Sequence, residues 1–174
     1  PVMCEDKVRF VGDGVALVAA ESEEIAQRAL ELIDVEYEPL PAVFDPRDAL
    51  KENAPKIYDK GNLLSHNKMR KGDVEKGFEE ADLILERTYS VPFIEHAYME
   101  PDISRAIPQP DGTMLVEGPM QAPFSTRRNL AAVLGLPINK VRVRQIHMGG
   151  GFGGKEDSSI DVGVRAAVLA TKTG

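Results

Sequence analysis

The chain has 174 residues, of which 43% are hydrophobic and 28% are charged, and this composition suits one large or two small globular domains. Its net charge of −7 argues against nucleic acid as the main partner, because phosphate binding relies on clustered Lys and Arg. The single cysteine, Cys4, excludes an internal disulfide and an iron–sulfur cluster ligated by this chain alone.

The sequence pattern of the first 55 residues predicts a small α/β unit. Strands are predicted at 7–11, 15–20 and 35–38. Ser22 is the predicted N-cap of a helix that runs to about Ile33, and the two glutamates after it lie where the helix dipole favours anions. A short helix is expected at 47–52.

A polar stretch with several turn formers follows this unit, so we expect a linker at 56–80 and a second domain at 81–174. Strands are predicted at 83–91, 104–107, 114–117 and 141–146, and helices at 73–81 and 160–172. Ser125 or Thr126 is the expected cap of a further helix through Leu134, because Gly135 suits the left-handed position just beyond a helix end.

The apolar runs of this sequence are all short. No apolar run approaches the ~20 residues that span a bilayer, and the N-terminus has no charged region followed by an apolar one. Because the chain starts at Pro1 and stops directly after an apolar helical run, we expect a piece of a longer polypeptide, located in the cytoplasm.

A glycine-rich loop, Gly149–Glu156, is the most informative segment. It holds five glycines and follows a predicted strand, so main-chain N–H groups can approach an anionic or bulky cofactor closely. The spacing satisfies a dinucleotide fingerprint and nearly satisfies a phosphate loop, in which Glu156 stands where Ser or Thr would hold magnesium. A flexible or tightly turned connector remains an alternative.

Two further segments carry polar chemistry. Gln121 follows a predicted strand, and its amide is able to donate to an oxo or carbonyl oxygen, although such a glutamine taken alone is more often a loop residue with satisfied local bonds. The segment 95–101 gathers Glu95, His96, Tyr98 and Glu100, which fits either the rim of a site or a polar turn bonded to backbone. A metal bound by His96 with the two glutamates, or a nucleophilic pair using Cys4, is only weakly indicated.

Taken in order, these motifs resemble those of a known family. The segments that carry the resemblance are Glu95–Pro101, Gly118–Gln121, Leu134–Pro137 with Val141–Val143, and Met148–Glu156, preceded by Asp6–Gly12, Ala26–Ala29, Val35–Ala42 and Lys71–Phe78. They are similar to the molybdenum-binding (large) subunit of the xanthine dehydrogenase/aldehyde oxidase family of molybdenum hydroxylases. The resemblance is colinear and covers essentially the whole chain.

The resemblance implies an α+β (mixed α/β) fold, with the C-terminal portion of an α/β-hammerhead domain at 1–55 and the N-terminal part of a molybdopterin-binding domain at 81–174. It implies an oxidoreductase that hydroxylates an N-heterocycle or an aldehyde, with water as the oxygen source. The implied cofactor is a molybdopterin-type molybdenum cofactor whose electrons pass to 2Fe–2S and FAD groups. These groups belong to partner domains or subunits of an oligomer, in which the rest of the large subunit completes the site.

Residue roles follow from the same resemblance. Gln121 matches the glutamine that hydrogen-bonds a molybdenum oxygen ligand, and Gly151, Phe152 and Gly153 match the loop whose backbone contacts the cofactor. Glu156 matches a substrate-facing position, and an acid there favours N-heterocycles such as purines.

The resemblance also limits what the chain does alone. It implies that no side chain need ligate the metal. The base glutamate is expected beyond Gly174, so Glu95, Glu100 and Glu117 are not assigned that role. The piece alone is therefore expected to be inactive. A small nucleotide-binding module using Gly149–Lys155, and a non-catalytic scaffold piece, stay open as alternatives.

Overall fold

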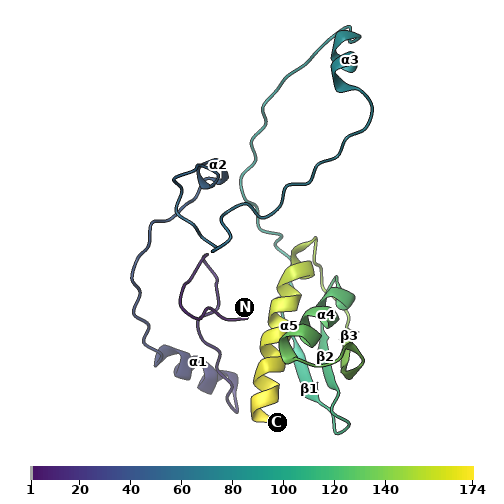
Figure 1. Cartoon of the computed structure of the whole chain (residues 1–174). Helices are drawn as coiled ribbons and strands as arrows, with labels where there is room; N and C mark the ends of the chain where they lie inside the picture. Colours follow the sequence, from purple (N-terminus) through teal and green to yellow (C-terminus); the bar gives the residue numbers. More distant parts are fainter. Residues whose placement is uncertain (1) are drawn as a thin grey trace. The chain divides into compact units, whose positions relative to one another are not determined.

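The computed structural model describes residues 2–174, and the chain divides into two units (Figure 1). The first unit contains the residues up to Glu36 together with Glu95–Gly174, and the second is Tyr37–Ile94. Within the described residues, every strand and both long helices belong to the first unit. The predicted mixed α+β class is confirmed.

A sheet of three strands forms the centre of the first unit. The strands are β1 (Arg105–Pro108), β2 (Met114–Gly118) and β3 (Val141–Gln145), in the spatial order β1-β2-β3. β1 pairs antiparallel with β2 across a short turn, whereas β2 and β3 run parallel and are joined through a helix. Parallel neighbours need such a crossover because both strands point the same way.

Two helices pack on the sheet, α4 (Pro123–Leu134) against β3 and α5 (Gly154–Thr173) against β1 and β2 (Figure 1). They also pack against each other, so their apolar faces and one face of the sheet enclose a common core. The buried core residues are Met114, Val116, Leu130, Ala131, Val141, Val164 and Ala167. The core is aliphatic, as expected for a chain without Trp.

The N-terminal part of the first unit contains α1 (Glu23–Glu31). As predicted, Ser22 caps this helix, and its hydroxyl oxygen accepts a hydrogen bond from the Ile25 N–H at 3.3 Å. Glu23 and Glu24 occupy the first turn, where the helix dipole favours negative charge.

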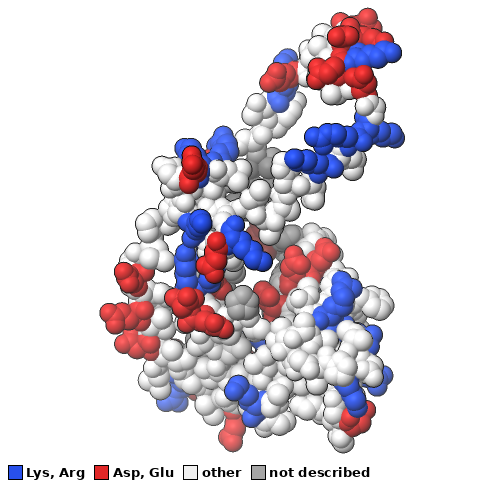
Figure 2. Space-filling view, viewed as in Figure 1, with Lys and Arg blue, Asp and Glu red and all other residues white. Residues whose placement is uncertain are grey.

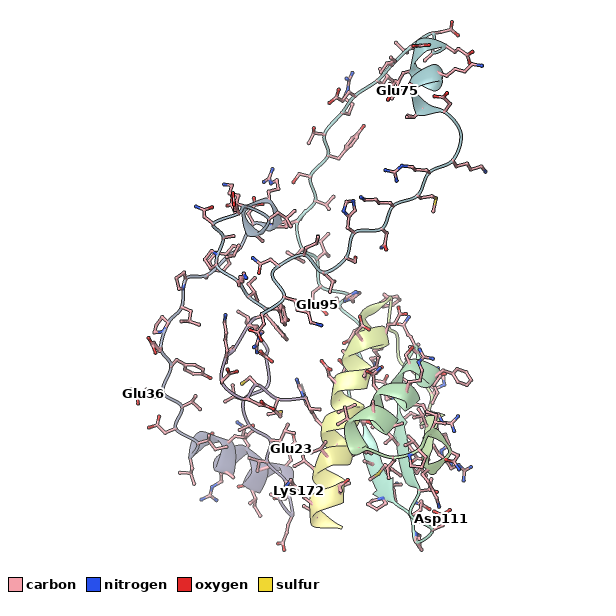
Figure 3. All side chains as sticks on the ribbon, in the orientation of Figure 1. Glu23, Glu36, Glu75, Glu95, Asp111 and Lys172 are labelled. Carbon is pink, nitrogen blue, oxygen red and sulfur yellow. The ribbon has the colours of Figure 1, made fainter. Side chains whose placement is uncertain are left out.

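The second unit has two short helices, α2 (Pro46–Ala49) and α3 (Val74–Glu79), whose first turns are capped by the side chains of Asp45 and Asp73. Asn62 ties a loop together by donating to the carbonyls of Ala49 and Pro55, both at 2.9 Å. None of residues 37–94 is buried, and Figure 3 shows their side chains projecting from the ribbon, as at Glu75 on α3.

Four predicted strands are wrong for the described residues. The segments 7–11, 15–20, 35–38 and 83–91 form no paired strand in residues 2–174. An alternating or apolar run gives a tendency to extend, but a strand is stabilised only when its N–H and C=O groups pair with a neighbour. Within the described chain, these segments meet no partner strand.

Two helix starts also differ from the prediction. α4 begins at Pro123, a residue whose fixed φ suits the first helical position, and Thr126 donates from its hydroxyl to the Ala122 carbonyl instead of capping. α5 begins at Gly154, six residues before the predicted start at 160. The end of α4 is as predicted, because Gly135 has a left-handed φ of 64°.

The described surface carries charges of both signs. On the face that Figure 2 shows, acidic and basic side chains are interspersed. None of the helices within residues 2–174 combines the length and the apolar composition that a bilayer crossing requires.

The core predicts the effect of a cavity at Leu130, whose side chain is fully buried between the helices and the sheet. We expect Leu130→Ala to lower the free energy of unfolding by about 2–5 kcal/mol, since it removes buried methyl groups and leaves a void. Val133→Ala, on the partly exposed side of the same helix, is the control and should cost about 0.5 kcal/mol or less. Urea denaturation followed by circular dichroism measures both; equal effects of the two variants would contradict this core.

Candidate functional site

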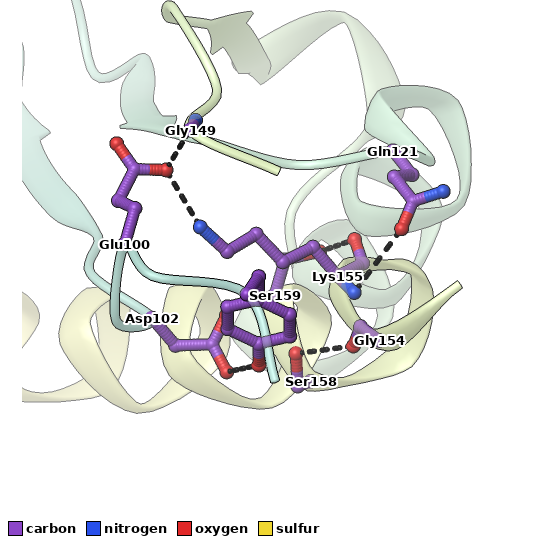
Figure 4. Close-up of polar contacts among 9 residues, drawn as sticks. Glu100, Asp102, Gln121, Gly149, Gly154, Lys155, Ser158 and Ser159 are labelled. Atoms are coloured by element: carbon purple, nitrogen blue, oxygen red, sulfur yellow. Dashed lines mark hydrogen bonds and ion pairs between the residues drawn. The ribbon is translucent and has the colours of Figure 1, made fainter. Parts of the chain in front are cut away.

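Gln121 connects the end of β2 to the glycine loop (Figure 4). Its Oε1 accepts hydrogen bonds from the N–H groups of Gly153 at 3.0 Å and Lys155 at 3.2 Å. The backbone N–H of Gln121 donates to the Lys155 carbonyl at 2.9 Å. The side-chain amide therefore lies directly against the loop, and the structure brings together four residues singled out in the sequence, Gln121, Gly151, Phe152 and Gly153.

These bonds also orient the Gln121 amide. An amide group has one oxygen that accepts and one NH₂ that donates. Because Oε1 faces the two loop N–H groups, Nε2 is the end of the amide turned away from them. The residue is exposed, so this end is accessible as a hydrogen-bond donor.

The glycines of the loop make room for neighbouring side chains. A Cβ on Gly151 would lie 2.6 Å from Gln121 Oε1, and one on Gly149 would lie 2.8 Å from the Glu100 Cβ. A Cβ on Gly154 would lie 2.5 Å from a ring carbon of Tyr98. The bare backbone thus has a packing role in addition to the ligand access that the sequence predicts, and no local pattern shows this role because the packing partners are distant in sequence.

Two residues without the freedom of glycine adopt left-handed backbone conformations here. Ala97 and Phe152 both have φ of 54°. Such a conformation costs a residue with a Cβ roughly 1–3 kcal/mol and is often found at functional sites. Phe152 is 76% exposed, so its ring is displayed on the surface instead of adding to the core.

Lys155 is buried completely, although it follows the loop directly. Its Nζ lies 2.6 Å from Glu100 Oε2 (Figure 4). The same Nζ lies 4.7 Å from the centroid of the Tyr98 ring. The Tyr98 hydroxyl in turn donates to Asp102 Oδ2 at 2.8 Å, and this bond raises the pKa of the tyrosine. The sequence indicates for Lys155 only the lysine of a phosphate loop, and no local signal predicts its burial against Glu100.

The segment 95–101 thus contacts the glycine loop through Tyr98 and Glu100, and both of its glutamates accept hydrogen bonds from backbone N–H groups. The bond from Lys155, followed by that from the Gly149 N–H, lowers the pKa of Glu100 below 4.5. A lowered folded-state pKa means that this carboxylate stabilises the fold above about pH 4.5 and loses that contribution as the pH falls through the lowered value.

The other sequence-predicted residues lie as follows. Glu156 is exposed in the first turn of α5, four residues after Phe152. Glu117 is buried and pairs with Arg144 on the neighbouring strand, and Glu95 accepts from the Ala97 N–H. Cys4 is a free, partly buried thiol. Among the residues described, no group of three or more His, Cys, Asp or Glu side chains is arranged to hold a metal ion.

Gly151 offers a steric test of the arrangement. We expect Gly151→Ala to push the Gln121 amide away from the Gly153 N–H, because the added Cβ would overlap Oε1. Gly77→Ala is the control, since a Cβ there meets nothing within 4 Å. Crystal structures of both variants would measure the Oε1 position, and an unmoved Gln121 amide in Gly151→Ala would contradict this packing.

Two protein-family models together match most of this chain. The family model of the molybdopterin cofactor-binding domain matches residues 57–174. The model of the aldehyde oxidase and xanthine dehydrogenase a/b hammerhead domain matches residues 1–41.

Relatives of known name match over most of the chain. A probable xanthine dehydrogenase subunit of Bacillus subtilis (strain 168) is 44% identical over 174 residues, which are 100% of this chain and 23% of the relative. The nicotinate dehydrogenase large molybdopterin subunit of Eubacterium barkeri is 38% identical over 160 residues, or 92% of this chain and 38% of the relative. The chain therefore spans between about a quarter and two fifths of these relatives.

A solved structure agrees with these matches. The aldehyde oxidoreductase of Desulfovibrio gigas superposes with a TM-score of 0.82 at 29% identity, over 98% of this chain and 19% of that one.

Proposed function

The chain belongs to the molybdopterin cofactor-binding domain family, and on that premise we propose that it forms one wall of the molybdenum site in a xanthine dehydrogenase/aldehyde oxidase-type oxidoreductase. The hydrogen bond from the Gly153 N–H to Gln121 Oε1 carries the proposal, because it joins the donor amide and the loop that displays Phe152. The names of the two relatives, a xanthine dehydrogenase subunit and a nicotinate dehydrogenase subunit, support the same class of enzyme.

The residues of this wall fit a pterin-held metal. Such a cofactor brings its own metal ligands, so the protein is required to orient and enclose it from a second layer of contacts. Gln121 supplies an uncharged donor, with Nε2 turned away from the loop by the two bonds at Oε1. We propose that Nε2 donates to an oxygen of the cofactor and that the backbone of Gly151 and Phe152 contacts it. Gly153 then acts through its bond to Gln121.

When bound, the cofactor would supply the two-electron chemistry that hydroxylates an N-heterocycle or an aldehyde with oxygen from water. The roles of this chain are to orient the cofactor, exclude water and bind substrate. The Phe152 ring, displayed at the surface, is suited to flank a flat heterocycle. Glu156, exposed in the first turn of α5 four residues after Phe152, is suited to accept a hydrogen bond from a ring N–H.

The contacts of the loop argue against a nucleotide-binding module. The N–H groups of Gly149, Gly153 and Lys155 already donate to Glu100 and Gln121. The Lys155 ammonium, which a phosphate loop would direct at its ligand, is buried against Glu100. These donors thus already have protein acceptors.

We further propose that the partners are 2Fe–2S and FAD domains or subunits of an oligomeric, cytoplasmic enzyme. The single cysteine supports the location of the clusters outside these 174 residues. The relatives from Bacillus subtilis and Eubacterium barkeri are both named as subunits, which supports an enzyme built from several chains. The base glutamate is likewise proposed to lie outside residues 1–174.

Gln121→Glu in the intact enzyme tests the donor role. The variant keeps an oxygen that accepts the loop N–H groups but replaces the Nε2 donor with a second oxygen. We expect turnover to fall by about tenfold or more, the effect of losing a hydrogen bond to a charged group. Gln145→Glu, at an exposed position of β3, is the control and should leave turnover unchanged.

Molybdenum analysis and the hydroxylation rate measure this prediction. Full activity of a folded Gln121→Glu enzyme would instead support the scaffold alternative.

Glu156→Ala tests substrate binding. We expect kcat/KM for a purine to fall by about tenfold, because a ring N–H would lose its acceptor, and kcat/KM for a small aldehyde to change little. Asp157→Ala, an exposed acid at the next position, controls for the loss of charge alone. Steady-state kinetics with both substrates measure the ratio; equal losses for purine and aldehyde would remove Glu156 from the substrate site.

A further inference from the structure

Glu100 Oε2 joins the two ends of the glycine loop. This one oxygen accepts from the Gly149 N–H at 2.9 Å, where the loop begins, and from Lys155 Nζ at 2.6 Å, where the loop ends. Both contacts reach across long sequence separations, 49 and 55 residues. The carboxylate therefore closes the loop into a ring that contains Phe152.

The Lys155 side chain is held strongly in this contact. A buried ammonium is costly to keep unless it is paired, and breaking such a pair by removing one partner is strongly destabilising. The Lys155 side chain is fully buried, and its Nζ also lies over the Tyr98 ring, which adds a cation–π contact. Because Tyr98 and Glu100 belong to one short segment, that segment and Lys155 form a single packed cluster.

The ring has a strained residue at its centre. Phe152 adopts a left-handed backbone and keeps its side chain in solvent, so burial of its own ring does not offset the strain. Such conformations persist when the surrounding structure determines them from several sides. Around Phe152, the fixed points are Glu100 at both loop ends and Gln121 at Gly153 and Lys155.

We propose that Lys155 and Glu100 are positioning residues, whose ion pair holds the Gly149–Lys155 loop so that Phe152 is presented in its left-handed, outward conformation. This inference rests on the proposed function for its purpose, since the presented ring would face a flat substrate. The hydrogen bonds and the ion pair that define the loop all lie within this chain.

The test compares Lys155→Met and Glu100→Gln in the full-length protein. Met keeps much of the length and the apolar stem of Lys155 without its charge, and Gln keeps an oxygen that accepts the Gly149 N–H. Lys172→Met, near the exposed end of the same helix, is the matched control. The readouts are amide hydrogen exchange of the loop and the ¹⁹F NMR signal of fluorinated phenylalanine at 152, assigned with Phe152→Leu.

In both cluster variants we expect loop exchange to accelerate by about tenfold or more, as local opening becomes easier, while amides of β2 stay within about twofold. The Phe152 signal should broaden or split, and Lys172→Met should match the wild type. Unchanged loop exchange and an unchanged Phe152 signal would overturn the proposal, as would equal acceleration in β2 and the loop. If Lys155→Met fails to fold, Glu100→Gln decides alone.

Neither readout needs the cofactor, so this test is separate from that of the proposed function. Molybdenum content of the wild-type protein is measured in parallel. A protein without molybdenum would contradict the proposed function, whereas the loop measurements would still decide the role of Lys155 and Glu100.

Discussion

The candidate site depends on the two hydrogen bonds that Gln121 Oε1 accepts from the start of α5. The first N–H groups of any helix lack partners within the helix, and the N-cap of α5, Gly153, has no side chain to supply one. Gln121, which lies just after the end of β2, supplies the missing acceptor for these N–H groups. One amide thus caps the helix, fixes the end of the glycine loop and orients its own Nε2 outward.

The topology of the sheet explains why these residues meet. β2 and β3 are parallel, so their carboxyl ends lie at the same edge of the sheet. Gln121 follows the end of β2 at Gly118, and the glycine loop follows the end of β3 at Gln145. The bond from the Ile146 N–H to the Gly118 carbonyl extends the pairing toward the site. In open α/β sheets this edge is the usual place for ligands.

Local signals predicted much of the fold, whereas contacts between distant residues decided what the sequence left open. Ser22 and Gly135 carry their capping chemistry within a few residues, so α1 and the end of α4 were predictable. The start of α5 differs from the prediction because glycines are poor helix formers, and the acceptor for the N–H groups at this start, Gln121, is distant in sequence. The resemblance already pointed to Gln121 and the loop, but no local pattern shows that Lys155 pairs with Glu100 at a separation of 55 residues.

The two units differ in what can stabilise them, and this difference bears on the rigidity of the site. No residue of 37–94 is fully buried, so this unit gains little from the hydrophobic effect; its contacts include helix caps, surface ion pairs and the bonds of Asn62. The strand-loop-helix part of the first unit encloses an aliphatic core. Gln121, Glu100 and the glycine loop all belong to this part. A loop with left-handed Phe152 at its centre requires such a base, because strain is sustained only where packing and hydrogen bonds leave the backbone no lower-energy alternative.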